Sequence, residues 1–125
     1  GNMLNMFSGC KALTKAPKLP AETLAPQCYS QMFRSCELLA TAPALPATAL
    51  AVGCYQGMFY GCTSLNTITC LATNISASLS TSTWIKDAGN GTGTFYKAET
   101  MTSWPTTGIN GIPSGWTVET YQPSN

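Results

Sequence analysis

Histidine is absent from the 125 residues, and charged side chains make up only 9% of the chain. Between Leu38 and Ile85 there is no Asp, Glu, Lys or Arg. A protein that binds nucleic acid neutralises several phosphates with a basic stripe. The one cluster of cations in this chain has two glutamates among it: Lys11, Lys15, Lys18 and Arg34, with Glu22 and Glu37. The composition therefore argues against a nucleic-acid partner.

Long apolar runs are also missing. Pro43, Pro46 and Gly53 interrupt the nearest candidate, so the sequence predicts no membrane span in this segment. Polarity comes instead from Thr, Ser, Asn and Gln, which is more common on exported proteins than on cytosolic enzymes. We therefore expect an extracellular or cell-surface protein, whose export signal or lipid anchor would lie in an N-terminal part outside this sequence.

What the chain does contain is a repeat of 26 residues. Its start occurs three times: Met6-Phe7, Cys10 and Leu13; Met32-Phe33, Cys36 and Leu39; Met58-Phe59, Cys62 and Leu65. The third copy diverges after this start, whereas the first two stay similar throughout. A period of twenty to fifty residues indicates stacked units, each unable to bury its apolar face alone. We assign three leucine-rich-repeat-like units to residues 1–85, at 6–31, 32–57 and 58–83.

The first half of a unit, residues 11–20 in the first copy, is too rich in proline for a helix and predicts a short extended strand that ends in a turn. Leu13, Ala16 and either Lys18 or Leu19 follow the L-x-x-L-x-L spacing of a leucine-rich repeat. Pro17 lacks the N–H that a sheet would use, so we expect a strand of only three or four residues.

The second half of the unit, residues 20–33, predicts a helix of about three turns. Leu24, Cys28 and Met32 fall at i, i+4 and i+8, and Tyr29 adds a neighbouring row, which together give an apolar stripe. The expected fold class is therefore an α/β repeat solenoid, a stack of short strands and short helices.

After residue 85 the repeat gives way to a glycine-rich loop and two segments, 94–98 and 116–121, whose alternation predicts strands. A repeat stack must seal its open apolar end. The chain offers five large apolar side chains for this: Phe95, Trp104, Ile109, Ile112 and Trp116. We expect residues 86–125 to form a C-terminal β cap. The N-terminal end has no such cover, which would allow a homo-oligomer to form through that end.

The six cysteines follow the repeat. Cys10 and Cys28 recur as Cys36 and Cys54, but the third unit has Ser80 at the second place and gains Cys70. This exchange favours the disulfides Cys10–Cys28, Cys36–Cys54 and Cys62–Cys70, although six cysteines allow fifteen pairings. Buried free thiols are the alternative. The long spacings argue against zinc, and without histidine we expect no catalytic thiolate.

Catalytic machinery of other kinds is not indicated either. The five carboxylates are scattered, whereas a glycosidase needs two that face each other across a cleft: Glu22, Glu37, Asp87, Glu99 and Glu119. The glycines of 89–93 lack the Lys-Ser/Thr ending of a phosphate loop. Asp87 with Asn90 offers too few oxygen ligands for calcium. We predict no catalytic residue, no cofactor and no metal site.

The remaining candidate is a surface. Solenoids expose an extended concave face to their partners, and residues between the inward-facing positions of the predicted strands would form it. These candidate binding residues are Thr14, Lys15, Pro17, Thr41, Pro43, Thr67 and Thr69. A neutral face rich in hydroxyl groups would suit a glycan or a protein partner.

The repeated Phe-x-x-Cys-x-x-Leu core resembles the BspA-like leucine-rich repeats of bacterial surface proteins. It occurs as Phe7-Cys10-Leu13, Phe33-Cys36-Leu39 and Phe59-Cys62-Leu65, and residues 93–97, 101–104 and 111–118 resemble the caps that follow such arrays. The resemblance implies a right-handed strand-and-helix solenoid, export to the cell surface and adhesion, with no catalytic residues to carry over. This chain departs from the family by its strand prolines and an extra cysteine per unit.

From these features we predict a non-enzymatic adhesion module that binds a host or bacterial surface protein or glycan. The first alternative is a structural spacer within a larger surface protein. A carbohydrate-active enzyme fragment is the remaining alternative.

Overall fold

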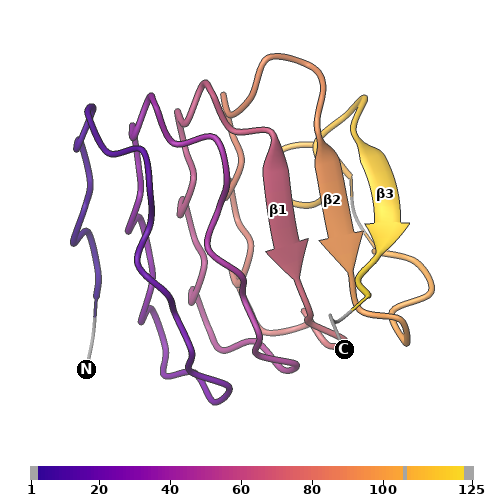
Figure 1. The fold of residues 1–125 in the computed structure, drawn as a ribbon. Coiled ribbons are helices and arrows are strands. Elements are labelled where there is room, and N and C mark those ends of the chain that lie inside the picture. Colours follow the sequence, from indigo (N-terminus) through magenta and orange to yellow (C-terminus); the bar gives the residue numbers. More distant parts are fainter. Residues whose placement is uncertain (1–2, 106, 123–125) are drawn as a thin grey trace.

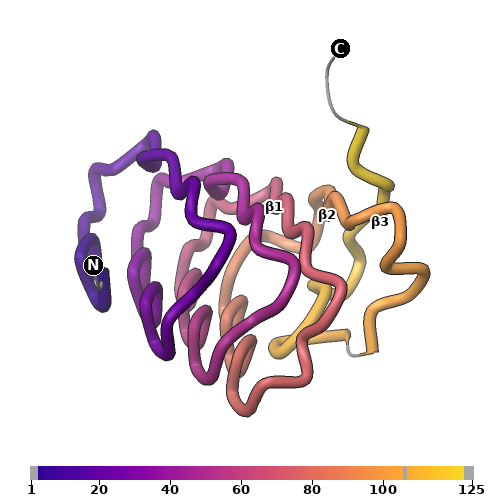
Figure 2. The backbone as a smooth tube through the Cα atoms, turned by 90° about the horizontal axis from the view of Figure 1, so that it is seen from below, coloured from indigo at the N-terminus to yellow at the C-terminus, as the bar shows by residue number. Residues whose placement is uncertain are grey.

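The computed structural model describes residues 3–105 and 107–122. The chain winds into a stack of coils that runs from the N-terminal to the C-terminal end (Figure 1). Strands β1 (Thr67–Cys70), β2 (Thr94–Lys97) and β3 (Thr117–Thr120) form one parallel sheet in the order β1-β2-β3. Viewed from below, the extended segments lie on one side of the stack and tight turns on the other (Figure 2).

The two strands predicted in the C-terminal segment are confirmed as β2 and β3, and they continue the sheet of the repeats. The second unit contributes only isolated bridges, from Thr41 to Thr67, from Leu45 to Cys70 and from Ala49 to Asn74. In the described part of the first unit there is no bridge at all. Pro17 and Pro43 account for this, because a proline cannot donate to a sheet ladder.

The helix predicted over residues 20–33 is wrong, and the described part of the chain contains no helix. Consecutive tight turns occupy these places, in four segments that we call the turn runs: residues 4–9, 26–35, 52–61 and 78–87. Along a run, alternate amides donate to the carbonyl three residues back, as Met32 does to Tyr29 at 3.1 Å. The amides in between donate to the next coil, as Phe33 does to Met58 at 3.0 Å. An α-helix would keep all these bonds within one segment.

Backbone conformation explains why the turn runs resemble helices in sequence. Left-handed φ recurs at every fourth residue, in register between coils: Gln27, Gln31 and Ser35; Gly53, Gly57 and Gly61; Leu79, Thr83 and Asp87. A four-residue period places apolar side chains at i, i+4 and i+8 on the inner side, just as a helix would. The three regularly spaced glycines were the missed signal, because L side chains are disfavoured at positive φ.

Changing Gly57 to Ala should lower the free energy of unfolding by about 1–2 kcal/mol, because the new side chain would sit in the left-handed region. Gly57 has φ 60°, and an added Cβ would lie 3.2 Å from Cγ of Gln31. Urea unfolding measures the change. Gln56→Ala, at the neighbouring half-buried position, is the matched control, and an equal loss in both variants would contradict the prediction.

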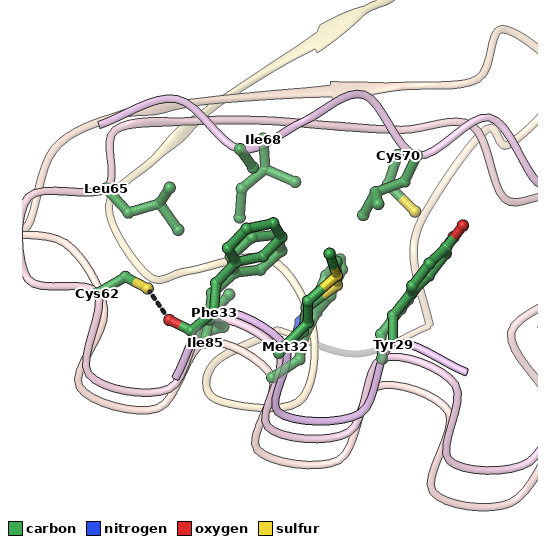
Figure 3. Close-up of a cluster of buried hydrophobic side chains, with 14 of the residues drawn as sticks. Tyr29, Met32, Phe33, Cys62, Leu65, Ile68, Cys70 and Ile85 are labelled. Carbon is green, nitrogen blue, oxygen red and sulfur yellow. Dashed lines mark hydrogen bonds between the residues drawn. The ribbon is translucent and has the colours of Figure 1, made fainter. Parts of the chain in front are cut away.

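The space between the sheet and the turn runs is filled by side chains that repeat from coil to coil (Figure 3). Phe7, Phe33 and Phe59 form a phenylalanine column, with ring centroids 5.6 and 5.8 Å apart and nearly parallel planes. A second column contains Tyr29, Tyr55, Trp84 and Trp104, with successive centroids 6.3, 6.0 and 5.8 Å apart. Leu39 and Leu65 are fully buried beside them, as the repeat predicts. The phenylalanines and the two tyrosines hold equivalent positions, whereas Trp84 holds the place of Met58. Stacked rings therefore connect successive coils.

At the C-terminal end, four of the five side chains predicted to seal the stack are buried: Phe95, Trp104, Ile112 and Trp116. Ile109 is 46% exposed, so its assignment as a sealing side chain is wrong. Ile109 contributes its backbone instead: its carbonyl accepts a hydrogen bond from the Ile85 amide at 3.4 Å. The Thr83 amide donates to Oδ1 of Asn110 at 2.7 Å, and Nε1 of Trp84 to the Gly111 carbonyl at 2.8 Å. Residues 109–111 thus close the last turn run by hydrogen bonding.

Among the described residues there is no apolar helix of the length that spans a bilayer.

Candidate functional site

The register of the sheet aligns four threonines on its outer surface. Thr67 pairs with Thr94, Thr94 pairs with Thr117, and Thr41 forms a bridge to Thr67. We call these residues the threonine row. In β1 the alternation is clear, because Thr67 is half-buried while its neighbour Ile68 is fully buried in the core. The row therefore presents methyl and hydroxyl groups at regular intervals across parallel strands. The Thr67 hydroxyl donates to Oδ1 of Asn66 at 2.8 Å, so it is offered to a ligand as an acceptor.

A hollow of about 220 Å³ lies on the same sheet, two residues further along the strands, and we call it the tyrosine hollow. Its lining is Thr69, Tyr96, Thr120, Tyr121 and Gln122. Thr69 and Tyr96 pair between β1 and β2, so the sheet itself sets their spacing. Nζ of Lys97 donates to Oγ1 of Thr120 at 3.5 Å. The hollow thus combines two phenol rings with hydroxyl and amide groups; its lining is uncharged, with Lys97 beside it and Glu119 paired with Tyr96 in the sheet.

Five of the seven predicted binding residues fall into three places. Thr41 and Thr67 belong to the threonine row, and Thr69 lines the tyrosine hollow. Pro17 and Pro43 line a separate apolar groove of about 360 Å³ between the first two units.

The remaining predicted binding residues, Thr14 and Lys15, are exposed. Neither of them pairs with a strand in the described part of the chain. Sequence reasoning missed six residues of this surface: Thr94, Tyr96, Thr117, Thr120, Tyr121 and Gln122. They lie in the segment that we assigned only to the cap. The alternation of Thr94 and Tyr96 around buried Phe95 was the available signal, because β-strand side chains two apart share a face.

A larger hollow of about 690 Å³ lies between the last turn run and the segment around Met101. Its walls carry many hydroxyl groups, but several donate within the protein. Oγ of Ser80 donates to the Ile75 carbonyl at 3.0 Å, and Oγ1 of Thr81 to the Asn110 carbonyl at 2.7 Å. These groups support the fold, so we place the candidate site on the sheet face instead.

None of the six cysteines is paired, which contradicts the predicted disulfides and agrees with the alternative of free thiols. Figure 3 shows Cys62 and Cys70 at opposite ends of the buried cluster, with Phe33 between them. The exchange of Ser80 for Cys70 also has another explanation. Cys70 bridges to Leu45, so it occupies the core position of a leucine, one residue out of the simple 26-residue alignment.

The thiols follow the stack in two columns. One contains Cys10, Cys36 and Cys62; the other contains Cys28 and Cys54, and Cys70 lies near Cys54 from the sheet side. Burial raises the pKa of Cys54 to about 11 and the pKa values of Cys62 and Cys70 to about 12. The Cys62 thiol donates to the Phe33 carbonyl at 3.0 Å. These thiols are protonated near neutral pH and act as small core residues.

The ionisable groups gather into no reactive cluster in the described part of the chain. No group of three Cys, Asp or Glu residues there is arranged to hold a metal ion. All five carboxylates are exposed at the surface. The ion pair between Nζ of Lys11 and Oε2 of Glu37, at 3.6 Å, is exposed too and adds little stability. The chemistry that the sheet face offers is hydrogen bonding and ring contact.

Comparison with protein-family models, curated proteins and solved structures finds no match for this chain.

Proposed function

We propose that this chain is a non-enzymatic binding module that holds neutral glycans on its sheet face. The observation that carries the proposal is the placement of the tyrosine hollow beside the threonine row. Tyrosine combines an apolar ring with a polar tip, so it can contact the C–H face of a sugar while hydroxyl groups bond to its hydroxyls. The rings of Tyr96 and Tyr121 would contact the C–H face of the sugar, and the threonine hydroxyls would bond to its hydroxyls.

Size and charge favour a sugar chain over a compact cofactor. The hollow is smaller than the roughly 300 Å³ at which drug-sized pockets begin, so it suits one unit of a longer ligand. The rest of that ligand would lie along the threonine row, across the strands. The lining itself is uncharged, and the charges beside it, Glu119 opposite Tyr96 and Lys97 on Thr120, are of opposite sign, so a neutral glycan fits it better than an acidic one.

A cell-surface location and adhesion to a host or bacterial surface are part of this proposal. They rest on the uncharged, hydroxyl-rich composition and on the resemblance to BspA-like repeats. The finer description of the fold as a right-handed leucine-rich-repeat solenoid is likewise proposed. The 26-residue period, the parallel sheet and the buried leucines support it.

A glycan array followed by titration with the strongest ligand tests the function. Tyr96→Ala should weaken binding at least about tenfold, because an aromatic side chain at the centre of a contact commonly contributes more than about 1 kcal/mol. Thr67→Ala should weaken it by less. Tyr60→Ala is the matched control, because Tyr60 is a half-buried tyrosine in a turn run, away from the sheet.

Other outcomes would favour other functions. Binding that survives Tyr96→Ala and Thr67→Ala together would place the contact elsewhere and contradict the proposal. The absence of any glycan ligand would favour a protein partner or the structural spacer. Release of sugar products from a polysaccharide would favour the carbohydrate-active enzyme.

A further inference from the structure

The two faces of each coil differ in hydrogen-bond polarity. In the turn runs, alternate amides point toward the next coil and alternate carbonyls toward the previous one. The Phe7 amide donates to the Met32 carbonyl at 2.9 Å, and the Phe33 amide to the Met58 carbonyl at 3.0 Å. The Phe59 amide donates to the Trp84 carbonyl at 2.8 Å. Every coil therefore has an amide face and a carbonyl face, and the stack can grow only head to tail.

The carbonyl face of the first coil is open among the described residues. Met6 and Ser8 stand where Met32 and Arg34 stand one coil later. The carbonyls of Met32 and Arg34 accept amides from Phe7 and Gly9 at 2.9 and 2.7 Å. The carbonyls of Met6 and Ser8 accept no backbone amide in the described chain. At the other end of the stack, by contrast, residues 109–111 close the amide face.

Side chains on the carbonyl face of the first coil are also more exposed than their equivalents in later coils. Met6 is 57% exposed, whereas Met32 and Met58 are fully buried. Phe7 is half-buried and stacks on one ring only, that of Phe33. The missing contacts are those that a preceding coil makes to each later coil.

The thiol hydrogen bonds indicate which groups would cover this face. Cys36 donates to the Phe7 carbonyl at 3.2 Å and Cys62 to the Phe33 carbonyl at 3.0 Å. Cys10 holds the equivalent place in the first coil, yet it is exposed. A preceding coil would supply both a phenylalanine carbonyl for Cys10 and a ring for the free face of Phe7.

The geometry points to a further coil of the same repeat as the occupant of this face, lying parallel with its amide edge on the first turn run. A second copy of the chain would not fit. Packed through the same face, it would oppose carbonyl to carbonyl. Packed head to tail, it would need an amide edge that its own residues 109–111 already occupy.

An extended chain tests this inference. A copy of residues 27–52 fused directly ahead of residue 1 preserves the 26-residue register, and Cys28→Ser and Cys36→Ser within the copy keep it free of thiols. Native alkylation with iodoacetamide, mapped by mass spectrometry, should modify Cys10 at least about tenfold more slowly than in the original chain. The matched control is a fusion of the same 26 residues in scrambled order, which should leave the rate unchanged.

Three results would overturn the inference. One is an unprotected Cys10 in a fusion whose buried thiols Cys54, Cys62 and Cys70 remain protected. Another is equal protection by the scrambled segment. The third is a dimer of the original chain, seen by sedimentation, in which Cys10 is already protected, since that would identify a second copy as the occupant.

Discussion

Phe59→Ala is expected to lower the free energy of unfolding by about 3–5 kcal/mol, the usual cost of removing a fully buried aromatic ring. The ring is 0% exposed, and its centroid lies 5.8 Å from that of Phe33 and 6.3 Å from that of Trp84. Its loss interrupts the phenylalanine column where the repeats meet the C-terminal segment. Since a domain of this size is stable by about 5–15 kcal/mol, the variant should be close to unfolding. Urea titration followed by circular dichroism measures the effect.

Phe7→Ala is the matched control, because it removes the same side chain from the same column at the open end. Phe7 is half-buried and stacks only on Phe33. Its replacement should cost less than half as much as the loss of Phe59. Equal costs would show that the column is not a continuous part of the core.

Alkaline pH is expected to destabilise the protein in reducing buffer, beginning near pH 9. Burial raises the pKa of Cys54 from 9.0 to about 11 and the pKa values of Cys62 and Cys70 to about 12. Between these values the unfolded chain binds fewer protons than the folded chain, so the free energy of unfolding falls as pH rises. Each thiol contributes up to about 1.4 kcal/mol per pH unit. The stability these thiols provide is fully present at pH 7 and is lost progressively between pH 9 and 12.

Urea titrations at pH 7, 9, 10 and 11 test this dependence. Cys70→Val is the matched variant, because it places a small apolar side chain at the position that Leu45 occupies one coil earlier. The slope between pH 9 and 11 should become shallower but stay negative, since one buried thiol is gone while other thiols and tyrosines with raised pKa values remain. Stability that stays constant to pH 11 in the original chain would contradict protonated, buried thiols.

The repeat in the sequence predicted which side chains are buried. Met32 and Met58 share one phase of the 26-residue period, Leu39 and Leu65 share another, and all four lie in the core. The two strands near the C-terminal end were also predictable, because Thr94 and Tyr96 alternate with buried Phe95. Burial and alternation are local properties of the sequence, so no knowledge of the fold was needed to see them.

The turn runs were not predictable from apolar periodicity, because a four-residue turn period and a helix place side chains in nearly the same way. What distinguishes the two is where the amides donate. In this protein half of them bond to the next coil, and that partner is distant in sequence. The glycine spacing at Gly53, Gly57 and Gly61 was a clue, but the equivalent positions carry glutamine, serine, leucine, threonine and aspartate in other coils.

Two further features, the role of Cys70 and the tyrosine hollow, could not be predicted from the sequence. The one-residue shift that pairs Leu45 with Cys70 made Cys70 look like a disulfide partner, although it fills a core position. The tyrosine hollow could not be foreseen, because Tyr96 and Tyr121 join it from segments that carry no repeat. Both depend on strand register, which is set by packing across the whole stack.

By itself the sequence determined that this protein is a stack of similar coils with one shared apolar interior. That followed because each unit carries more apolar surface than it can bury alone. Only the tertiary structure decided that tight turns replace helices, that the thiols stay free, and that four threonines align beside a tyrosine hollow. The physical reason is that these features depend on hydrogen bonds and register between coils, which form only when distant segments lie side by side.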